Sequence, residues 1–276
     1  MKRVPRPSAA ALLLALALAF APAAPAAAQR IGSEGLAGLG AQIVVLGEVH
    51  DNAEHHANQA LAVALLRPAA LVFEMLSPER AAAATPANRE SAAQLGAALQ
   101  WEASGWPDFA MYFPIFAAAP EATVRGAAVP RASLLHAIAE GAEAAFGLEA
   151  ARFGLAEPLA PEVQRLREAE QMAAHCNALP PERMAGMVAV QRLRDAALAQ
   201  AALAALELTG GPVAVITGSG HARSDYGVPA LLRRAAPGVS VLALGQIEAP
   251  AEEVQPYDRW IVTDPAPRGD PCLAFR

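Results

Sequence analysis

Ionisable side chains directly follow three apolar runs of the sequence. Glu48 and His50 come after the first run, Glu74 after the second and His221 after a later one. Such groups are costly to bury unless they are paired or bind a ligand. If the runs are parallel strands, their carboxyl ends share one sheet edge, where open α/β sheets bind ligands. We therefore interpret the four residues as one site; the alternative for any single residue is a helix cap or an ion-pair partner.

Carboxylates and imidazoles at such an edge point to acid–base chemistry. Glu and His activate water directly or through a metal ion. Glu48, Glu74 and His221 are therefore the catalytic candidates if the protein is a hydrolase. His55 and His56 do not fit the helical zinc motif, in which a Glu directly follows the first His. They point about 100° apart on a helix, so one of them is expected to be a solvated surface histidine.

The loop Gly218-Ser219-Gly220 suggests a phosphate-binding turn but departs from the known motifs. Arg223 stands where a dinucleotide fingerprint has its third glycine. The sequence also has no P-loop lysine and no G-x-S-x-G serine elbow. Nucleotide binding and serine hydrolase chemistry are therefore disfavoured.

A polar stripe and an aromatic stretch add further candidate residues. Gln191 and Asp195 lie four apart in an apolar helical pattern and share a face. We favour a face aimed at a polar site over one turned to solvent. The stretch from Trp106 to Pro114 contains Tyr112. This stretch either belongs to the hydrophobic core or lines the binding site of a flat apolar ligand. Core packing is the more common case.

Five short apolar runs predict buried strands, and most are bordered by Gly or Pro. They are Ile43–Leu46, Leu71–Phe73, Thr123–Val129, Val213–Thr217 and Val239–Leu244, with a sixth strand expected around Trp260–Thr263. Apolar strands that alternate with helices predict a parallel sheet covered on both faces. The fold class is therefore α/β, with an open, mostly parallel sheet flanked by helices.

The middle of the chain, about residues 130–210, contains more helix than a single crossover requires. Its predicted helices are Leu134–Phe146, Pro161–His175 and Pro181–Leu208. We interpret this region as a helical insertion that packs on the sheet.

Residues 1–28 have the pattern of a secretory signal peptide. Basic residues precede an apolar run from Ala9 to Phe20, and small residues at 26–28 offer a cleavage site. We therefore expect export to the periplasm, with residues 29–276 as one mature domain without a membrane span.

The full chain has a net charge of −6, and loss of the basic leader makes it more acidic. Binding to nucleic acid is therefore disfavoured.

The mature chain has two cysteines, Cys176 and Cys272. Disulfides form and persist in exported proteins. We expect one bridge that ties the C-terminal tail to the end of a helix, because no further metal ligands stand beside Cys272.

These residues together resemble the ChaN-like haem-binding proteins, a family grouped with the Tiki, TraB and erythromycin esterase proteins. The resemblance covers about residues 40–245. The matching segments are Val45–Asn52 with His55, His56 and Gln59, then Phe73–Met75, Trp106–Pro114, Gln191–Asp195 and Gly218–Arg223, extended by Asp225, Gly227, Val228 and Pro229. The order and spacing of these segments carry the resemblance.

The resemblance implies an α/β fold, haem binding linked to iron uptake, and a dimer that forms around cofacial haem. Tyrosine ligates haem iron in this family, so Tyr112 or Tyr226 is expected to bind ferric iron as a phenolate, as tyrosine does in catalase. Tyr112 is the preferred one of the two. Many relatives are lipoproteins, whereas no cysteine stands at the cleavage site here. The expected haem-binding residues are Tyr112, Tyr226, Glu48, His50, Glu74, Arg194, Asp195, His221 and Arg223.

Three functions are compatible with these observations. The favoured one is a periplasmic haem-binding protein without enzymatic activity, whose iron is held through a tyrosine. The second is a hydrolase that uses the Glu and His cluster, with or without a metal ion. The third is a periplasmic partner protein that has kept the fold.

Overall fold

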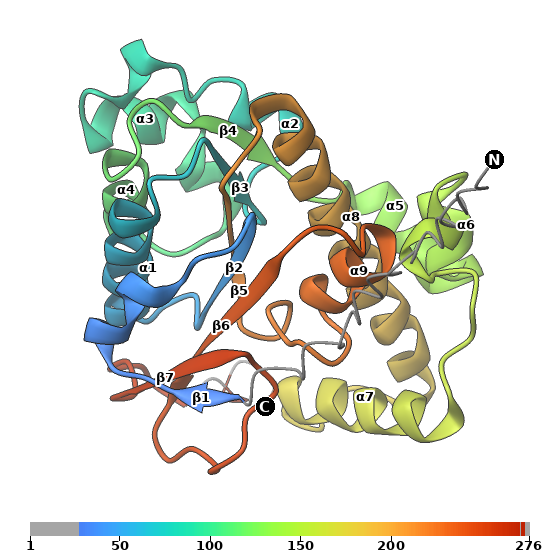
Figure 1. The fold of residues 1–276 in the computed structure, drawn as a ribbon. Helices are drawn as coiled ribbons and strands as arrows, with labels where there is room; N and C mark the ends of the chain where they lie inside the picture. Colours follow the sequence, from blue (N-terminus) through green and yellow to red (C-terminus); the bar gives the residue numbers. More distant parts are fainter. Residues whose placement is uncertain (1–27, 271, 274–276) are drawn as a thin grey trace, which may run out of the picture.

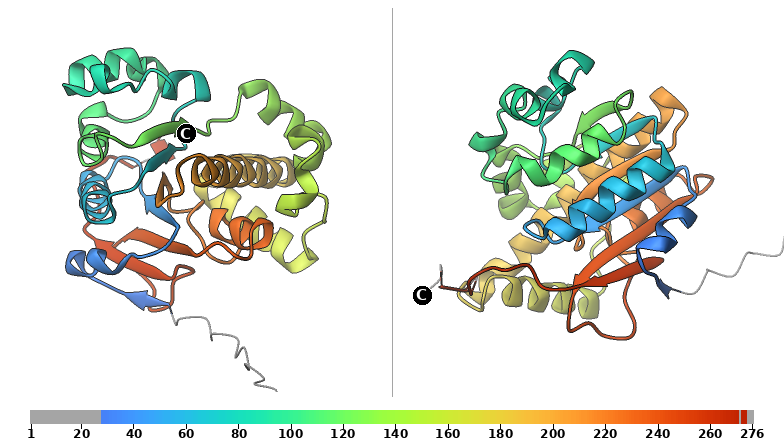
Figure 2. Two further views of the ribbon diagram at one scale, coloured as in Figure 1. Left: turned by 45° about the horizontal axis from the view of Figure 1, so that its top comes forward. Right: turned by 90° about the vertical axis from the view of Figure 1, so that its left-hand side faces the viewer.

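A seven-stranded sheet with helices on both faces forms the described part of the chain (Figures 1 and 2). The computed structural model describes residues 28–270 and 272–273. The strands lie in the order β1-β7-β6-β2-β5-β3-β4, and every neighbouring pair is parallel. The predicted α/β class with an open, mostly parallel sheet is confirmed. The predicted signal peptide lies outside the described residues, except for its last position.

All six predicted strands are present, with ends that shift by a few residues. The strands are β1 (Gln29–Arg30), β2 (Ile43–Glu48), β3 (Ala70–Phe73), β4 (Thr123–Gly126), β5 (Val213–Gly218), β6 (Val241–Glu248) and β7 (Arg259–Thr263). The additional strand, β1, has only two exposed residues. A strand of this length has no recognisable period.

The helical region between β4 and β5 is also present. The α-helices are α1 (Ala53–Leu66), α2 (Pro78–Ala81), α3 (Ala92–Ala98), α4 (Phe109–Ala117), α5 (Arg131–Glu140), α6 (Ala142–Phe146), α7 (Pro161–Ala174), α8 (Met184–Thr209) and α9 (Val228–Ala235). Short 3₁₀ helices are η1 (Ser33–Gly38), η2 (Pro86–Arg89), η3 (Trp101–Ser104), η4 (Ala150–Phe153) and η5 (Pro181–Arg183). The expected helix over Leu134–Phe146 is divided at Gly141, whose φ of 91° is outside the helical range.

The central strands are apolar on both faces because each face supports its own core. On β2, Val44 and Leu46 pack with α1 and α4, whereas Ile43 and Val45 pack with α8 and α9. Successive side chains of a strand point to opposite faces. The sequence of a strand that is covered on both faces is therefore continuously apolar, instead of alternating between apolar and polar residues.

The carboxyl end of β2 lies where the chain connections diverge across the sheet. After β2 the chain reaches β3 on one side, and after β5 it crosses to β6 on the other side of β2. Glu48 at the end of β2 is in register with Gly218 at the end of β5. Such a switch point is where open α/β sheets bind ligands.

Cys176 and Cys272 form the expected disulfide. Cys176 lies two residues after the end of α7, and Cys272 lies in the C-terminal tail. Their sequence separation of 96 residues makes the bridge a long-range tie between the helical region and the tail.

We predict that the unreduced, denatured protein contains no free thiol. A loop of this length should stabilise the fold by about 4.7 kcal/mol in the chain-entropy model, so a Cys176→Ser, Cys272→Ser variant should unfold at lower denaturant concentration. Thiol labelling and urea unfolding measure the two effects. Two titratable thiols in the wild-type protein would contradict the prediction.

Candidate functional site

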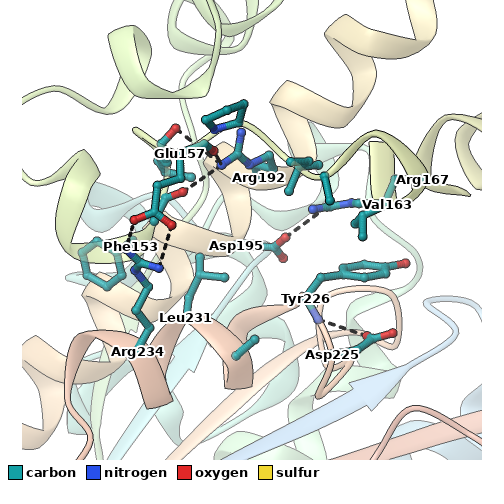
Figure 3. Close-up of a pocket in the computed structure, with 16 residues that line it drawn as sticks. Phe153, Glu157, Val163, Arg167, Arg192, Asp195, Asp225, Tyr226, Leu231 and Arg234 are labelled. Atoms are coloured by element: carbon teal, nitrogen blue, oxygen red, sulfur yellow. Dashed lines mark hydrogen bonds and ion pairs between the residues drawn. The ribbon is translucent and has the colours of Figure 1, made fainter. Parts of the chain in front are cut away.

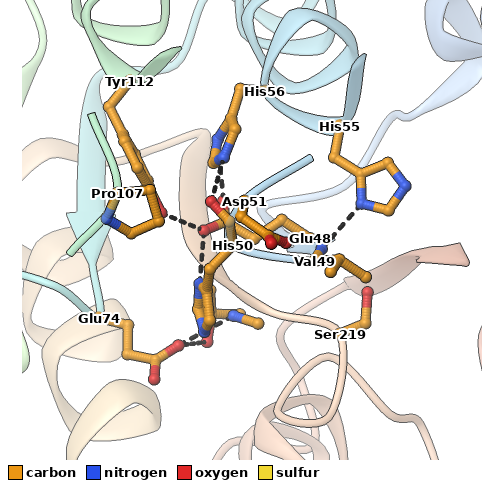
Figure 4. A network of polar contacts seen from close by, with 12 residues as sticks. Glu48, Val49, His50, Asp51, His55, His56, Glu74, Pro107, Tyr112 and Ser219 are labelled. Atoms are coloured by element: carbon orange, nitrogen blue, oxygen red, sulfur yellow. Dashed lines mark hydrogen bonds and ion pairs between the residues drawn. The ribbon is translucent and has the colours of Figure 1, made fainter. Parts of the chain in front are cut away.

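The carboxylate of Glu48 is the centre of a buried polar network (Figure 4). Glu48 is the last residue of β2. Its Oε1 accepts a hydrogen bond from Tyr112 Oη of α4 at 2.8 Å and lies 2.8 Å from His50 Nδ1. The carboxylate therefore holds α4 and the loop after β2 to the same point of the sheet edge.

The second oxygen of Glu48 faces His56 of α1. Glu48 Oε2 and His56 Nδ1 are 3.4 Å apart, and neither atom forms a hydrogen bond. His56 Nε2 lies 2.9 Å from the backbone oxygen of His50. The α1 helix is held in place at its start, where the Asn52 side chain accepts hydrogen bonds from the first backbone N–H groups.

The expectation that His55 or His56 is a surface residue is wrong, because both are buried. His55 Nδ1 accepts a hydrogen bond from the backbone N–H of Val49, and its Nε2 lies 2.8 Å from Thr263 Oγ1 at the end of β7. Burial lowers the pKa of His55 to about 4. The two histidines point in different directions from α1, but both directions are covered. His55 faces Thr263 at the end of β7, and the His56 ring packs against Tyr112 of α4.

Glu74 follows β3 and supplies the second buried carboxylate. Its Oε2 accepts hydrogen bonds from Thr217 Oγ1 at 2.6 Å and from the Gly218 N–H at 2.9 Å. Its Oε1 lies 3.5 Å from His221 Nε2. Burial alone would raise the pKa of Glu74, but the charges of His221 and His50 and these hydrogen bonds together lower it to about 2.

His221 is held between two carboxylates. Its Nδ1 lies 2.6 Å from Asp195 Oδ1, and Asp195 Oδ2 is 3.5 Å from the buried Arg167 guanidinium. Burial opposes the charged imidazole, but Glu74 and Asp195 outweigh it and raise the pKa of His221. The polar stripe predicted on the long helix therefore does face the strand ends through Asp195.

His50 contacts one carboxylate, Glu48, and is influenced by the charge of the other, Glu74. Burial opposes its charge, yet the bond to Glu48 and the charge of Glu74 raise its pKa. A Cβ on Gly218 would lie 3.0 Å from His50 Nε2, so glycine leaves room for the ring there. The His50 ring centroid is 4.7 Å from that of Trp106. The structure thus brings Glu48, His50, Glu74 and His221 together, as the strand-end argument predicted.

A small cavity opens beside this network. It has a volume of about 140 Å³, and its lining includes Glu74, Trp106 and Arg194. Arg194 is half-buried on α8.

Thr217 and Arg167 were not predicted as site residues, because a threonine inside a strand and an arginine in a charged helix carry no distinguishing pattern.

Tyr226 lies apart from the strand ends, in the loop before α9. Its Oη donates to Glu170 Oε2 of α7. The guanidinium carbons of Arg167 and Arg223 each lie 4.3 Å from its ring centroid. Burial and the hydrogen bond to Glu170 raise the pKa of Tyr226, while the two arginines oppose that rise.

The Tyr226 ring borders a cavity of about 270 Å³ between α7, α8 and α9 (Figure 3). Leu155, Leu159, Val163 and Leu231 give this cavity apolar walls. Arg167, Arg192 and Arg234 also line it.

The three tyrosines of the sequence differ in how accessible their phenols are. Tyr112 is 0% exposed, and burial and the charge of Glu48 raise its pKa. Tyr257 is buried and donates to the backbone oxygen of Ser219, and burial raises its pKa to about 12. Tyr226 alone is half-buried. The geometry therefore favours Tyr226 over Tyr112 as a ligand for a bulky group, and the identity of that ligand stays a prediction.

Two further findings concern the described residues. No helix in residues 28–270 and 272–273 is long and apolar enough to cross a membrane. Within the same residues, no group of three or more His, Cys, Asp and Glu side chains is arranged to hold a metal ion.

We predict that Glu74→Gln lowers the pKa of His221. In the wild type, folding raises this pKa above 6.5. The charged imidazole therefore stabilises the fold fully below pH 6.5, and this contribution is lost as pH rises through the raised pKa. NMR titration of the imidazole signals measures the shift, and the exposed Glu121→Gln is the matched control. An unchanged His221 titration in Glu74→Gln would show that the carboxylate does not act on it.

Comparisons with known proteins identify a family and a similar fold. A family model described as haem-binding uptake, Tiki superfamily, ChaN matches residues 37–232. The solved structure "Cofacial heme binding to ChaN of Campylobacter jejuni" is 18% identical, with 83% of this chain and 90% of that chain covered and a TM-score of 0.62, which shows a shared fold.

A solved structure of a succinoglycan biosynthesis protein is 13% identical, with 78% of this chain and 68% of that chain covered, but its TM-score of 0.38 supports no argument. No curated protein matches the chain. Because the family model spans well over half of the sequence, the chain belongs to the ChaN family of haem-binding uptake proteins in the Tiki superfamily.

Proposed function

We propose that this protein binds ferric haem in the periplasm and serves haem uptake or transfer. The match of the ChaN family model over residues 37–232 is the observation that carries the proposal. The similar Campylobacter jejuni protein binds haem cofacially. The secretory pattern of residues 1–28 supports the periplasmic location.

The surroundings of Tyr226 fit a ferric haem. When bound, haem supplies a ferric iron that accepts an anionic oxygen donor. The Tyr226 phenol already donates to Glu170, so this carboxylate can take the proton when the phenolate forms. Arg167 and Arg223 lie against the ring and stabilise a negative oxygen. Tyr226 is therefore the proposed ligand.

Arginines around this region provide partners for the haem propionates. Arg167, Arg192 and Arg234 line the cavity, and Arg223 lies beside Tyr226. The lining also includes Glu157, Asp195 and Asp225, which pair with Arg234, Arg167 and Arg223. Arg192 donates only to backbone oxygens and forms no ion pair with a described residue, so it is the cation most available to an anionic ligand. Guanidinium groups also bind carboxylates in a bidentate manner.

A haem bound at Tyr226 would extend beyond this cavity. A volume of about 270 Å³ corresponds to about nine water volumes, which is smaller than a porphyrin. One protomer would thus leave a haem face exposed, and burial of that face against a second haem and protomer would favour a dimer.

We predict that Tyr226→Phe abolishes the absorbance band of phenolate-bound ferric haem. The substitution removes the oxygen and keeps the ring that Arg167 and Arg223 contact. Tyr112→Phe is the matched control: it should keep the band, although it loses the hydrogen bond to Glu48. Absorbance titration with haem measures both variants. The proposal is contradicted if the wild type shows no saturable haem binding, and the choice of ligand is wrong if only Tyr112→Phe loses the band.

A second candidate, a hydrolase, is favoured by the chain of contacts from Asp195 through His221 to Glu74. An imidazole held between two carboxylates is suited to proton transfer. Tyr226 takes no part in that chain of contacts, so Tyr226→Phe would keep hydrolysis and His221→Ala would lose it. Assays with a panel of esters and amides test this candidate, and an absence of turnover across the panel would remove it.

A further inference from the structure

The 140 Å³ cavity at the strand ends contains two opposite charges that do not pair with each other. Glu74 and Arg194 both line it, but the two side chains form no ion pair. Glu74 is ionised at neutral pH, because its pKa is about 2. An anionic and a cationic residue thus line the same small space.

The Arg194 guanidinium makes no hydrogen bond or ion pair with any described residue. It lies near the network, because it lines the same cavity as Glu74, and its charge opposes the rise in the pKa of His221. A half-buried cation without a partner has given up part of its hydration without compensation. The side chain is therefore available to an anionic ligand group.

One of the two oxygens of the Glu74 carboxylate can also accept further hydrogen bonds. Its Oε2 is engaged by Thr217 and Gly218, whereas Oε1 has only the 3.5 Å contact with His221. Figure 4 shows Glu74 with one oxygen directed toward the residues drawn around His50; its other oxygen, Oε1, faces His221 at 3.5 Å. That oxygen can accept hydrogen bonds from a cationic ligand group.

The remaining lining limits the size and type of ligand. Trp106 supplies an aromatic ring, and the other lining residues, Ala127, Ala128, Val129 and Leu198, are small or apolar. The volume corresponds to about five waters, enough for a molecule of a few heavy atoms. An indole also attracts ammonium groups through the cation–π interaction.

We propose that this cavity binds the zwitterionic head of a small free α-amino acid, with its carboxylate on Arg194 and its ammonium on Glu74 beside Trp106. A simple carboxylate would satisfy Arg194 but approach the negative charge of Glu74. A simple amine would satisfy Glu74 but approach Arg194. Only a ligand that carries both charges pairs both groups, and this site is independent of the proposed haem ligand Tyr226.

Isothermal titration calorimetry with glycine, acetate and methylamine tests the proposal. Glycine should bind saturably to the wild-type protein, and acetate and methylamine should bind at least about tenfold more weakly, because each loses one charged hydrogen-bonded contact. Arg194→Gln should weaken glycine binding by about tenfold or more, and the exposed Arg165→Gln should leave it unchanged. Tyr226→Phe should bind glycine as the wild type does, which separates this site from the proposed haem site.

Arg194→Gln is the decisive variant, because its side chain has no partner to lose and folding should be preserved. Glu74→Gln should also weaken glycine binding, but it changes the bonds to Thr217 and Gly218 and needs a parallel melting curve. Acetate binding as tight as glycine binding would overturn the zwitterion assignment. Absence of saturable glycine binding, or equal binding by Arg194→Gln, would overturn the site itself.

Discussion

The fold depends on how two carboxylates are accommodated at the edge of a buried parallel sheet. Glu48 ends β2 and Glu74 follows β3, and β5 lies between these strands. Each carboxylate would be costly to bury without partners. Tyr112 brings α4 to Glu48, and His221, itself bound to Asp195 of α8, lies against Glu74. Helices on opposite faces of the sheet are thus fixed to one polar edge.

This arrangement separates the protein into two polar regions with different chemistry. The strand-end network is mostly buried, with Tyr112 fully buried and His50 partly exposed, and the small cavity beside Trp106 and Arg194 adjoins it. The Tyr226 region lies between α7, α8 and α9 and is more open, with arginines around a phenol. Arg167 connects the two regions, because it contacts both Asp195 and the Tyr226 ring. Haem binding at the second region would therefore leave the first region free for another ligand.

Much of the fold and part of the site could be predicted because they follow from local patterns. Continuous apolar runs indicated the central strands, and the rule for parallel strands placed Glu48, Glu74 and His221 at one edge. Which side chains then pair depends on tertiary packing: no sequence pattern distinguishes Arg167 from Arg165, the other arginine of its helix. The burial of both His55 and His56 was missed for the same reason, because helical periodicity gives their directions but not what covers them.

The central claim, a haem held by Tyr226 outside the strand-end network, is tested most directly by locating the iron. Crystals of the haem-loaded full protein give an anomalous-scattering map at the iron absorption edge. The account predicts one iron peak per protomer, within bonding distance of Tyr226 Oη and between α7 and the loop before α9. A peak at Tyr112, or beside His50 and Glu74 at the strand ends, would contradict it.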